Sequence, residues 1–162
     1  MTVLSPADCV ETYKAIEAMM CYDGPCYIRL TGVNGTPAVY KQDYEFEIGK
    51  AITMVQGDDI AIIATGTMVY ESMRAARALK KNNISATVIN MHTIKPLDTK
   101  ILDSLRTKYS LIVTVEEHFK IGGLGSAISE YYSQFSNKTP QLILGIDDVF
   151  IKAGDYNYML DK

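Results

Sequence analysis

Apolar and polar residues are distributed in two alternating patterns from about residue 48 onward. Short apolar runs over residues 51–55, 60–65, 86–91, 111–115 and 141–146 have the length and composition of strands, and segments with helical periodicity lie between them. Such alternation predicts parallel strands with right-handed crossovers and helices on both faces of the sheet. The turn over residues 56–59 predicts a hairpin, with an antiparallel edge strand beside an internal one. The expected fold is α/β, a three-layer α/β/α domain with an about five-stranded mixed sheet: four parallel strands and an antiparallel first strand.

Three helices are expected between these strands, and each has a recognisable start or apolar face. The first is expected to be capped by Thr67 and the second by Asp98. Their predicted core positions are Val69, Met73, Ala76 and Leu79 in the first, Ile101, Leu102 and Leu105 in the second, and Leu124, Ile128, Tyr131 and Phe135 in the third. The tail over residues 155–162 predicts one further short helix.

The first 31 residues predict a separate helix and strand. Ser5, Pro6 and Asp8 have the spacing of a helix start, with Ser5 as the cap. Apolar residues then recur at spacings of three and four, which predicts one buried face formed by Val10, Tyr13, Ile16 and Met20. A strand is expected over residues 26–30, followed by irregular sequence. Because a lone helix and strand cannot bury their apolar faces, this orphan helix-strand unit is typical of the last part of a domain whose other strands are missing.

Composition and charge exclude several classes of protein. The 162-residue chain is 48% hydrophobic and 22% charged, with a formal net charge of −3, so it has no basic field for nucleic acid or an anionic membrane surface. No run approaches the roughly 18 apolar residues of a membrane helix, and the start MTVLSPADCVE lacks the basic region of a secretory signal. Cys9, Cys21 and Cys26 lack CxxC spacing, so reduced thiols in the cytoplasm are favoured over a zinc site.

The segment after the strand at 111–115 has the most candidate chemistry. Glu116, Glu117 and His118 follow that strand directly, and a glycine-rich turn then leads into a helix. Ligands and partners of open α/β sheets lie at the carboxyl ends of strands, which makes this a candidate anion-binding or interface site. Its members are Glu117, His118, Gly122, Gly123 and Gly125. The glycines also have a purely structural interpretation, as residues that allow a positive φ and a close helix approach.

The residues give no complete active site. The glycine spacing is neither G-x-G-x-x-G nor a phosphate loop, and no Ser-His-Asp or Cys-His arrangement is evident. His118 is more typical of a surface or interface residue than of a catalytic base, and His92 of a packing or interface residue. Arg29 is equally consistent with a contact between domains and with a ligand clamp. We therefore assign no catalytic, cofactor-binding or metal-binding residue to the chain.

A series of motifs resembles the C-terminal part of transketolases. The motifs are SPADxxE, GPCYIRL, GKA, GDDIAIIATGTMV, AARALK, TVINMHTIKPLD and VTVEEHFKIGGLGSAISE, and they cover almost the whole chain in order. TIKPLD followed by VTVEEH and GGLG is the most specific part. Deoxyxylulose phosphate synthases and the beta subunits of 2-oxo-acid dehydrogenases have similar patterns.

The resemblance implies a C-terminal fragment of a cytoplasmic enzyme of pentose phosphate metabolism that transfers a two-carbon ketol unit from a ketose to an aldose. It implies three regions: residues 1–31 from a truncated pyrimidine-binding domain, a linker over 32–47, and the transketolase C-terminal domain over 48–162. Thiamine diphosphate and a divalent cation such as Mg²⁺ bind elsewhere in the dimeric enzyme. The fragment is then expected to be structural or dimerising and inactive alone, with the remaining transketolase domains as partners.

One position departs from the family pattern. Many members have an arginine that grips the sugar phosphate three residues beyond the strand arginine, here Arg29, but this sequence has Gly32 there. A guanidinium is hard to replace in phosphate recognition. We therefore hypothesise that the parent enzyme uses a non-standard or unphosphorylated ketose, or clamps phosphate elsewhere.

Two alternatives stay open from the sequence. One is an independent small α/β module that binds an anion or a nucleotide at the glycine turn. The other is a C-terminal domain from a 2-oxo-acid dehydrogenase beta subunit or a deoxyxylulose phosphate synthase. Upstream sequence with cofactor motifs would favour an enzyme, whereas a native start at Met1 would favour the module.

Overall fold

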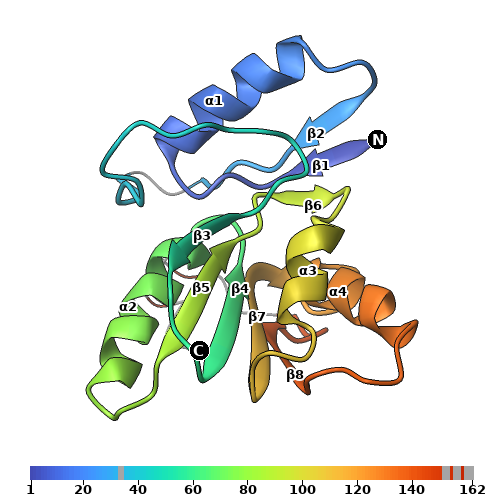
Figure 1. Ribbon diagram of the computed structural model, residues 1–162. Coiled ribbons are helices and arrows are strands. Elements are labelled where there is room, and N and C mark those ends of the chain that lie inside the picture. The colour runs from blue at the N-terminus through green and yellow to red at the C-terminus, as the bar shows by residue number, and fades with distance from the viewer. Residues whose placement is uncertain (33–34, 151–153, 155–157, 159–162) are drawn as a thin grey trace.

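A five-stranded sheet forms the centre of the larger part of the molecule (Figure 1). The computed structural model describes residues 1–32, 35–150, 154 and 158. The sheet order is β3-β5-β4-β7-β8, formed by β3 (Ile52–Val55), β5 (Ala86–Asn90), β4 (Ile60–Ala64), β7 (Leu111–Phe119) and β8 (Gln141–Ile146). β3 is antiparallel to β5, and the other neighbours are parallel. The predicted fold class, with four parallel strands and an antiparallel first strand, is confirmed.

The predicted hairpin between the first two strands of this sheet is wrong in its pairing. β3 pairs with β5 instead of with β4, which follows it in the chain. β4 is almost fully buried and has parallel partners on both sides, so only an edge position remains for the half-buried β3. The connecting turn packs against the start of β5: a Cβ at Gly57 would lie 2.5 Å from the backbone of Ala86. Glycine thus permits this close crossing.

Helices cover both faces of the sheet. α2 (Met68–Lys80) lies on one face, whereas α3 (Thr99–Leu105) and α4 (Leu124–Ser133) lie on the other (Figure 1). The core beneath α3 and α4 contains Leu102, Leu105, Leu124, Ile128 and Tyr132, packed with Ile63, Ile89 and Ile112 from the strands. The core on the α2 side contains Ala76 with Ile62, Val88 and Val113.

Most features predicted for these helices are present. Asp98 caps α3 by accepting a hydrogen bond from the Ile101 amide at 3.1 Å. Thr67 occupies the cap position of α2, but its side chain makes no capping bond and contacts Glu117 instead. In α4 the fully buried tyrosine is Tyr132, and Tyr131 is only partly buried. The final helix expected over residues 155–162 falls almost entirely outside the described residues.

A second, three-stranded sheet lies beside the carboxyl ends of the parallel strands. Its order is β2-β1-β6, with β1 (Thr2–Leu4) parallel to β2 (Cys26–Ile28) and antiparallel to β6 (Thr93–Lys95). β1 and β6 were not expected, because runs of three residues are too short to show strand periodicity. Since β6 belongs to the segment after β5, this small sheet joins the N-terminal residues to the larger domain.

The N-terminal helix starts later than the sequence predicts. α1 (Cys9–Met20) is capped by Asp8, whose Oδ1 accepts a hydrogen bond from the Glu11 amide at 2.8 Å. Ser5 is not the cap. Its backbone instead lies against the end of β4, where its carbonyl accepts a hydrogen bond from the Gly66 amide at 3.1 Å. The prediction of Ser5 as cap is therefore wrong because this segment forms tertiary contacts before the helix begins.

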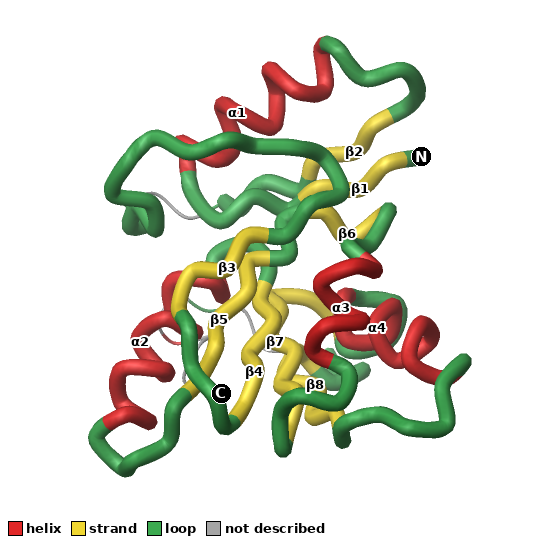
Figure 2. Tube along the Cα trace, in the orientation of Figure 1, coloured by secondary structure: helices red, strands yellow, loops and turns green. Residues whose placement is uncertain are grey.

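The apolar face predicted to be buried on α1 is exposed. Val10 is 41% exposed, Ile16 45%, Tyr13 64% and Met20 81%, whereas Glu11 and Ala15 are fully buried on the other side of the helix. The loop between β2 and β3 runs alongside α1 (Figure 2) and contacts it through Lys14 and Asp43, 2.7 Å apart. The helix thus packs through its polar side, and its apolar side has no partner among the described residues.

Candidate functional site

A cavity of about 180 Å³ lies where the small sheet meets the five-stranded sheet. One wall comes from the small sheet and the segments next to it, and the other from the ends of β4 and β7 and the turn that precedes α4. The lining residues are Val3, Ser5, Tyr27, Arg29, Thr65, Ile94, Glu116, Glu117, His118, Gly122 and Gly123. Four of the five predicted site residues therefore line one space, and Gly125 does not.

This position follows from the topology of the large sheet. After β4 the chain moves to β5 on one side, and it later returns to β7 on the other side of β4. Such a reversal of strand order opens a crevice outside the carboxyl ends of the two strands, here after Ala64 and at Glu116–His118. In this molecule the N-terminal residues occupy much of that crevice: Thr65 donates through its side chain to the Ser5 carbonyl at 3.2 Å.

Arg29 and Glu117 connect the two walls. The Arg29 guanidinium donates to the Glu117 carbonyl at 2.6 Å and lies 4.0 Å from the Glu117 carboxylate. The same carboxylate accepts a hydrogen bond from the Thr67 hydroxyl at the start of α2. The segment directly after β2, the end of β7 and the cap position of α2 thus meet at one ion pair.

Glu116 points to the other face of β7 and binds the start of α4. Its carboxylate oxygens accept hydrogen bonds from the amides of Leu124 at 2.7 Å and Gly125 at 2.8 Å. Burial raises the pKa of Glu116, whereas these two hydrogen bonds lower it. The helix N-terminus, where an external anion would bind, thus already holds a carboxylate of the same chain.

The glycines of the turn have steric reasons to be glycine. Gly122 has a φ of +76°, a conformation that L side chains rarely adopt. A Cβ at Gly123 would lie 1.9 Å from a carboxylate oxygen of Glu116, and a Cβ at Gly125 would lie 2.5 Å from the Ile143 side chain. These contacts are those expected for close packing of α4 on the sheet.

His118 lies at the exposed rim of the cavity. Its Nδ1 is 2.9 Å from the carbonyl oxygen of Phe119. In the neutral ring that bond assigns the proton to Nδ1 and leaves Nε2 as an acceptor. Glu117 and His118 are therefore brought to one cavity, together with Arg29.

A buried polar network near the cavity was not identified from the sequence. The Glu11 carboxylate is fully buried and accepts hydrogen bonds from the Ala7 amide at 2.7 Å, Asn90 Nδ2 at 2.8 Å and the Tyr40 hydroxyl at 3.0 Å. Burial raises its pKa. The second oxygen of Asp8 accepts from the Val39 amide at 2.7 Å. The SPADxxE motif contained the signal, but its spacing also suits an ordinary helix start.

His92 belongs to the same junction as a packing residue, as its position after a strand predicted. Its ring is fully buried against Phe46, with ring centroids 4.3 Å apart, and Nδ1 lies 2.9 Å from the Thr93 hydroxyl. Burial lowers the pKa of His92 to about 4. The ring is therefore neutral at pH 7.

The cavity between the two sheets is small, and the described residues form no cluster of metal-binding side chains. The cavity is smaller than the roughly 300 Å³ that is usual for cofactor and ligand pockets. Within residues 1–32, 35–150, 154 and 158, no group of three or more His, Cys, Asp or Glu side chains could hold a metal. None of the helices in this part of the chain is long and apolar enough to cross a membrane.

Fold and site together define a doubly wound α/β domain, with a small N-terminal unit docked at the crevice where the strand order of the sheet reverses. Comparison with known proteins identifies the family of this domain. Residues 49–162 match the model of the transketolase C-terminal domain, so the chain belongs to that family.

Relatives with similar sequences are sections and subunits of transketolases. The putative transketolase C-terminal section of Methanocaldococcus jannaschii is 40% identical over 99% of this chain and 50% of its own length. One subunit of the apulose-4-phosphate transketolase of Phocaeicola vulgatus is 36% identical over the whole chain and 53% of its own length. The chain thus spans about half the length of the curated relatives it matches.

Solved structures agree with this assignment. A split-gene transketolase, described as an inactive beta4 tetramer, superposes with a TM-score of 0.87 and 37% identity, covering 92% of this chain and 49% of that one. Transketolase of Pichia stipitis superposes with a TM-score of 0.56 and 23% identity, covering 88% of this chain and 20% of that one, which shows a shared fold.

Proposed function

We propose that this chain contributes the C-terminal part of a transketolase, which transfers a two-carbon ketol unit from a ketose to an aldose. The observation that carries the proposal is the match of almost the whole chain to a transketolase C-terminal section at 40% identity. Thiamine diphosphate, with a divalent cation, would supply the carbanion that carries the ketol unit. Both would bind to other domains or to a partner chain, as the resemblance to transketolases implies; residues 1–32, 35–150, 154 and 158 contain no group of three or more His, Cys, Asp or Glu side chains that could hold a metal.

The role of this chain in such an enzyme is to provide a stable domain and a docking surface. The exposed apolar side of α1 supports this role, because Val10, Tyr13 and Ile16 form a helix face that a soluble domain ordinarily covers. We propose that residues 1–31 complete a domain supplied by the rest of the transketolase, with 32–47 as linker and 48–162 as the C-terminal domain. The working enzyme would be a cytoplasmic dimer of such assemblies.

The glycine turn was considered as an anion-binding site or as an interface, and we propose that it is an interface. The amides of Leu124 and Gly125 already bind Glu116, which argues against an external anion at the helix start. Glu117 instead holds Arg29 of the small sheet. In this proposal Glu117, His118, Gly122, Gly123 and Gly125 position the N-terminal unit on the C-terminal domain.

The substrate hypothesis rests on Gly32. This residue is exposed, and a Cβ placed on it would have no atom within 4 Å, so the backbone leaves space for a larger side chain. We propose a ketose without a phosphate at the usual position, or a phosphate bound elsewhere. Normal efficiency with xylulose phosphate in the assembled enzyme would exclude the first version. A Gly32→Arg variant is expected to lower KM for phosphorylated ketoses.

Reconstitution tests the proposed activity. The chain is assayed for ketol transfer alone, with thiamine diphosphate and Mg²⁺, and with the N-terminal section of a split transketolase added. Activity is expected only in the last mixture. Activity of the chain alone, or failure to associate with any such section, would contradict the proposal. The alternative of a deoxyxylulose phosphate synthase would be supported instead if the reconstituted enzyme formed 1-deoxy-D-xylulose 5-phosphate and transferred no ketol unit.

A further inference from the structure

The cavity between the two sheets contains a hydroxyl group that lacks a partner. Ser5 lines the cavity and is 1% exposed. Its backbone amide donates to the His92 carbonyl and its carbonyl accepts from the Gly66 amide, but its hydroxyl has no hydrogen-bond partner among the described residues. Buried polar groups of folded proteins are nearly always hydrogen-bonded, to the protein, to water or to a ligand. The Ser5 hydroxyl is therefore available to a molecule in the cavity.

Arg29 has an uncommitted donor close to the same point. Its Nη2 donates to the Glu117 carbonyl at 2.6 Å, whereas its Nη1 makes no hydrogen bond within the described part of the chain. A Cβ on Gly66 would lie 3.0 Å from the Ser5 hydroxyl oxygen and 4.0 Å from Arg29 Nη1, so both groups lie around one point after β4. The wall from the N-terminal unit thus presents a positive charge and a hydroxyl together.

The wall that β7 contributes carries the opposite charge. Glu116 and Glu117 both line the cavity, and the Glu117 carboxylate lies 4.0 Å from Arg29 Nη2. An ionised carboxylate has about four acceptor positions, so the hydrogen bonds that these two side chains already accept leave capacity for further donors. Nε2 of His118 is another acceptor at the rim.

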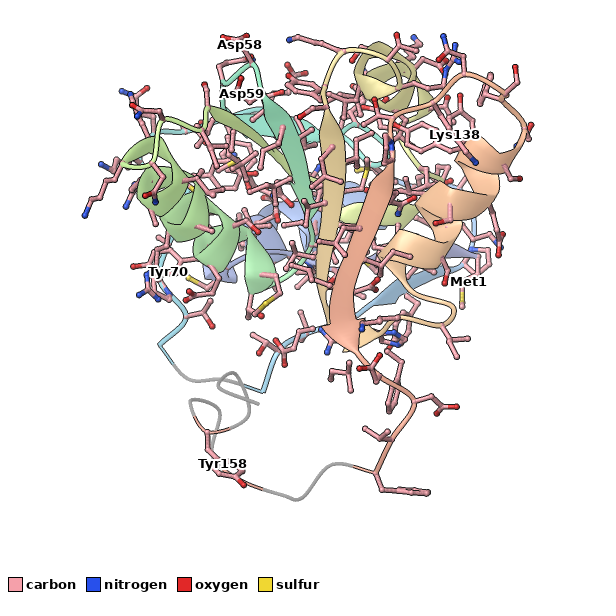
Figure 3. All side chains as sticks on the ribbon, turned by 90° about the horizontal axis from the view of Figure 1, so that it is seen from below. Met1, Asp58, Asp59, Tyr70, Lys138 and Tyr158 are labelled. Carbon is pink, nitrogen blue, oxygen red and sulfur yellow. The ribbon has the colours of Figure 1, made fainter. Side chains whose placement is uncertain are left out.

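The charges of these two walls decide which kind of ligand suits the cavity. Other charged side chains of the large sheet, such as Asp58, Asp59 and Lys138 (labelled in Figure 3), lie at the amino ends of the strands, whereas the cavity lies at the carboxyl ends. A simple anion in the cavity would be repelled by two carboxylates, and a simple cation by the guanidinium. A small molecule with one charge of each sign is attracted by both walls.

The volume of the cavity limits the size of that molecule. A water molecule takes about 30 Å³ in the liquid, so a cavity of about 180 Å³ suits a molecule of roughly six non-hydrogen atoms. Val3 and Ile94 also line the cavity and offer an apolar surface to a short side chain. Nucleotides and large amino acids are too big for this space.

We propose that the cavity binds a small zwitterionic α-amino acid of about the size of alanine. Arg29 Nη1 and the Ser5 hydroxyl bind the α-carboxylate, and the Glu117 carboxylate accepts from the α-ammonium, with His118 at the rim. The two charged groups of an α-amino acid are attached to the same carbon, so a guanidinium and a carboxylate that lie side by side can bind both at once. The ligand then bridges the N-terminal unit and the C-terminal domain.

The inference goes beyond ketol transfer and does not depend on it. Binding of the amino acid is measured in this chain alone, whereas the proposed activity needs a further section of a transketolase. Failed reconstitution would leave amino-acid binding unaffected, and absence of amino-acid binding would leave reconstitution possible. The two proposals fail in different experiments.

Titration of the full chain with L-alanine is the first test. Calorimetry is expected to show saturable binding at one site, and thermal unfolding should shift to higher temperature. Propionate and ethylamine each have one of the two charges, and erythritol has neither, so each is expected to bind at least tenfold more weakly at the same ionic strength. Absence of alanine binding overturns the proposal. Binding of propionate, ethylamine or erythritol as tight as that of alanine also overturns it, because the site would then recognise an anion, a cation or a polyol.

Removal of one hydroxyl tests the place of binding. Ser5→Ala is expected to weaken alanine binding about tenfold, the loss of one hydrogen bond to a charged group, and to leave the unfolding temperature of the free chain unchanged. Ser72→Ala is the matched control, because Ser72 is also buried with an unpartnered hydroxyl but lies in α2, outside the cavity. It should bind alanine as the parent chain does. Unchanged affinity in Ser5→Ala, or an equal loss in both variants, overturns the assignment to this cavity.

Hydrogen exchange tests the bridge between the two walls. Saturation with alanine is expected to slow amide exchange in β1 and β2 of the parent chain, because the ligand holds the small sheet against the ends of β4 and β7. The same concentration of alanine should have a much smaller effect on Ser5→Ala. Slower exchange that is confined to regions away from the two sheet edges would contradict binding between them.

Discussion

Helices α1 and α2 have the same kind of apolar periodicity, but only α2 buries it. Val69 and Ala76 of α2 are 0% and 6% exposed, whereas Val10 and Tyr13 of α1 are 41% and 64% exposed. α2 is covered because it lies on a five-stranded sheet. α1 belongs to a unit with three short strands and has no second layer on its apolar side among the described residues. The comparison teaches that periodicity identifies a face that needs a partner, and that the partner need not lie in the same part of the chain.

The largest expected effect is the difference in stability between two matched substitutions, one in the core of the large domain and one on α1. Ile128→Ala in α4 should lower the free energy of unfolding by about 2–5 kcal/mol, because Ile128 is fully buried. Ile16→Ala, the matched change in α1, should alter it by at most about 0.5 kcal/mol in the isolated chain. Denaturant unfolding followed by circular dichroism measures both. Equal losses would show that the α1 face is already covered.

A pH effect is expected at the junction of the two regions. The pKa of His92 is lowered by burial from 6.5 to about 4 in the folded chain. The unfolded chain therefore binds this proton first as the pH falls, and stability should decline between about pH 6.5 and 4. The loss from this group is about 3 kcal/mol at most. Unfolding curves across that range measure it. His92→Gln should remove this part of the slope, and an identical slope in the variant would exclude His92 as its source.

Removing one charge tests how α4 is held on the sheet. Glu116→Gln should lower the free energy of unfolding by about 1.5–3 kcal/mol, because the carboxylate accepts two amide hydrogen bonds at the helix start. Glu130→Gln, at an exposed position of the same helix, is the control and should cost little. Equal stability of the two variants would contradict the prediction, because it would mean that the hydrogen bonds of Glu116 do not stabilise the fold.

The smallest effect is expected where the two regions meet. Arg29→Lys should weaken the bond to the Glu117 carbonyl and cost about 1 kcal/mol. Hydrogen exchange should then become faster in β1 and β2 but stay unchanged in β4 and β7. Arg77→Lys on the exposed side of α2 provides the matched comparison. Faster exchange throughout the large sheet would mean that the two regions unfold as one unit.

The sequence predicts the larger domain better than the smaller unit, for physical reasons. Apolar runs such as Ile60–Ala64 are long enough to show strand character, and Asp98 has the chemistry of a helix cap. β1 and β6 have three residues each, and their pairing joins segments about ninety positions apart. The hairpin prediction failed because the turn at Gln56–Asp59 resembles a hairpin loop, whereas partner choice depends on β4 having parallel neighbours on both sides.

The candidate site was predictable in its place but not in its contacts. Glu117, His118 and two of the glycines meet at the strand ends, as the topology of an α/β sheet implies. Glu116 binds the α4 amides because its side chain points to that face of the sheet. The sequence would predict this direction only if β7 were known to continue through residue 116, since side chains alternate between faces only within a strand. Glu11 was missed because the SPADxxE motif that contains it also has the spacing of an ordinary helix start, which does not distinguish a buried carboxylate from an exposed one.

Hydrogen exchange of α1 tests the central claim most directly, since the claim is that the apolar side of α1 is a docking surface for the rest of a transketolase. The exchange of α1 amides is measured in the chain alone and after addition of the N-terminal section of a split transketolase, with α2 as the internal reference. We expect α1 to become strongly protected while α2 changes little, and Ile16→Asp to prevent both binding and protection. A complex that forms without added protection of α1 would contradict the account.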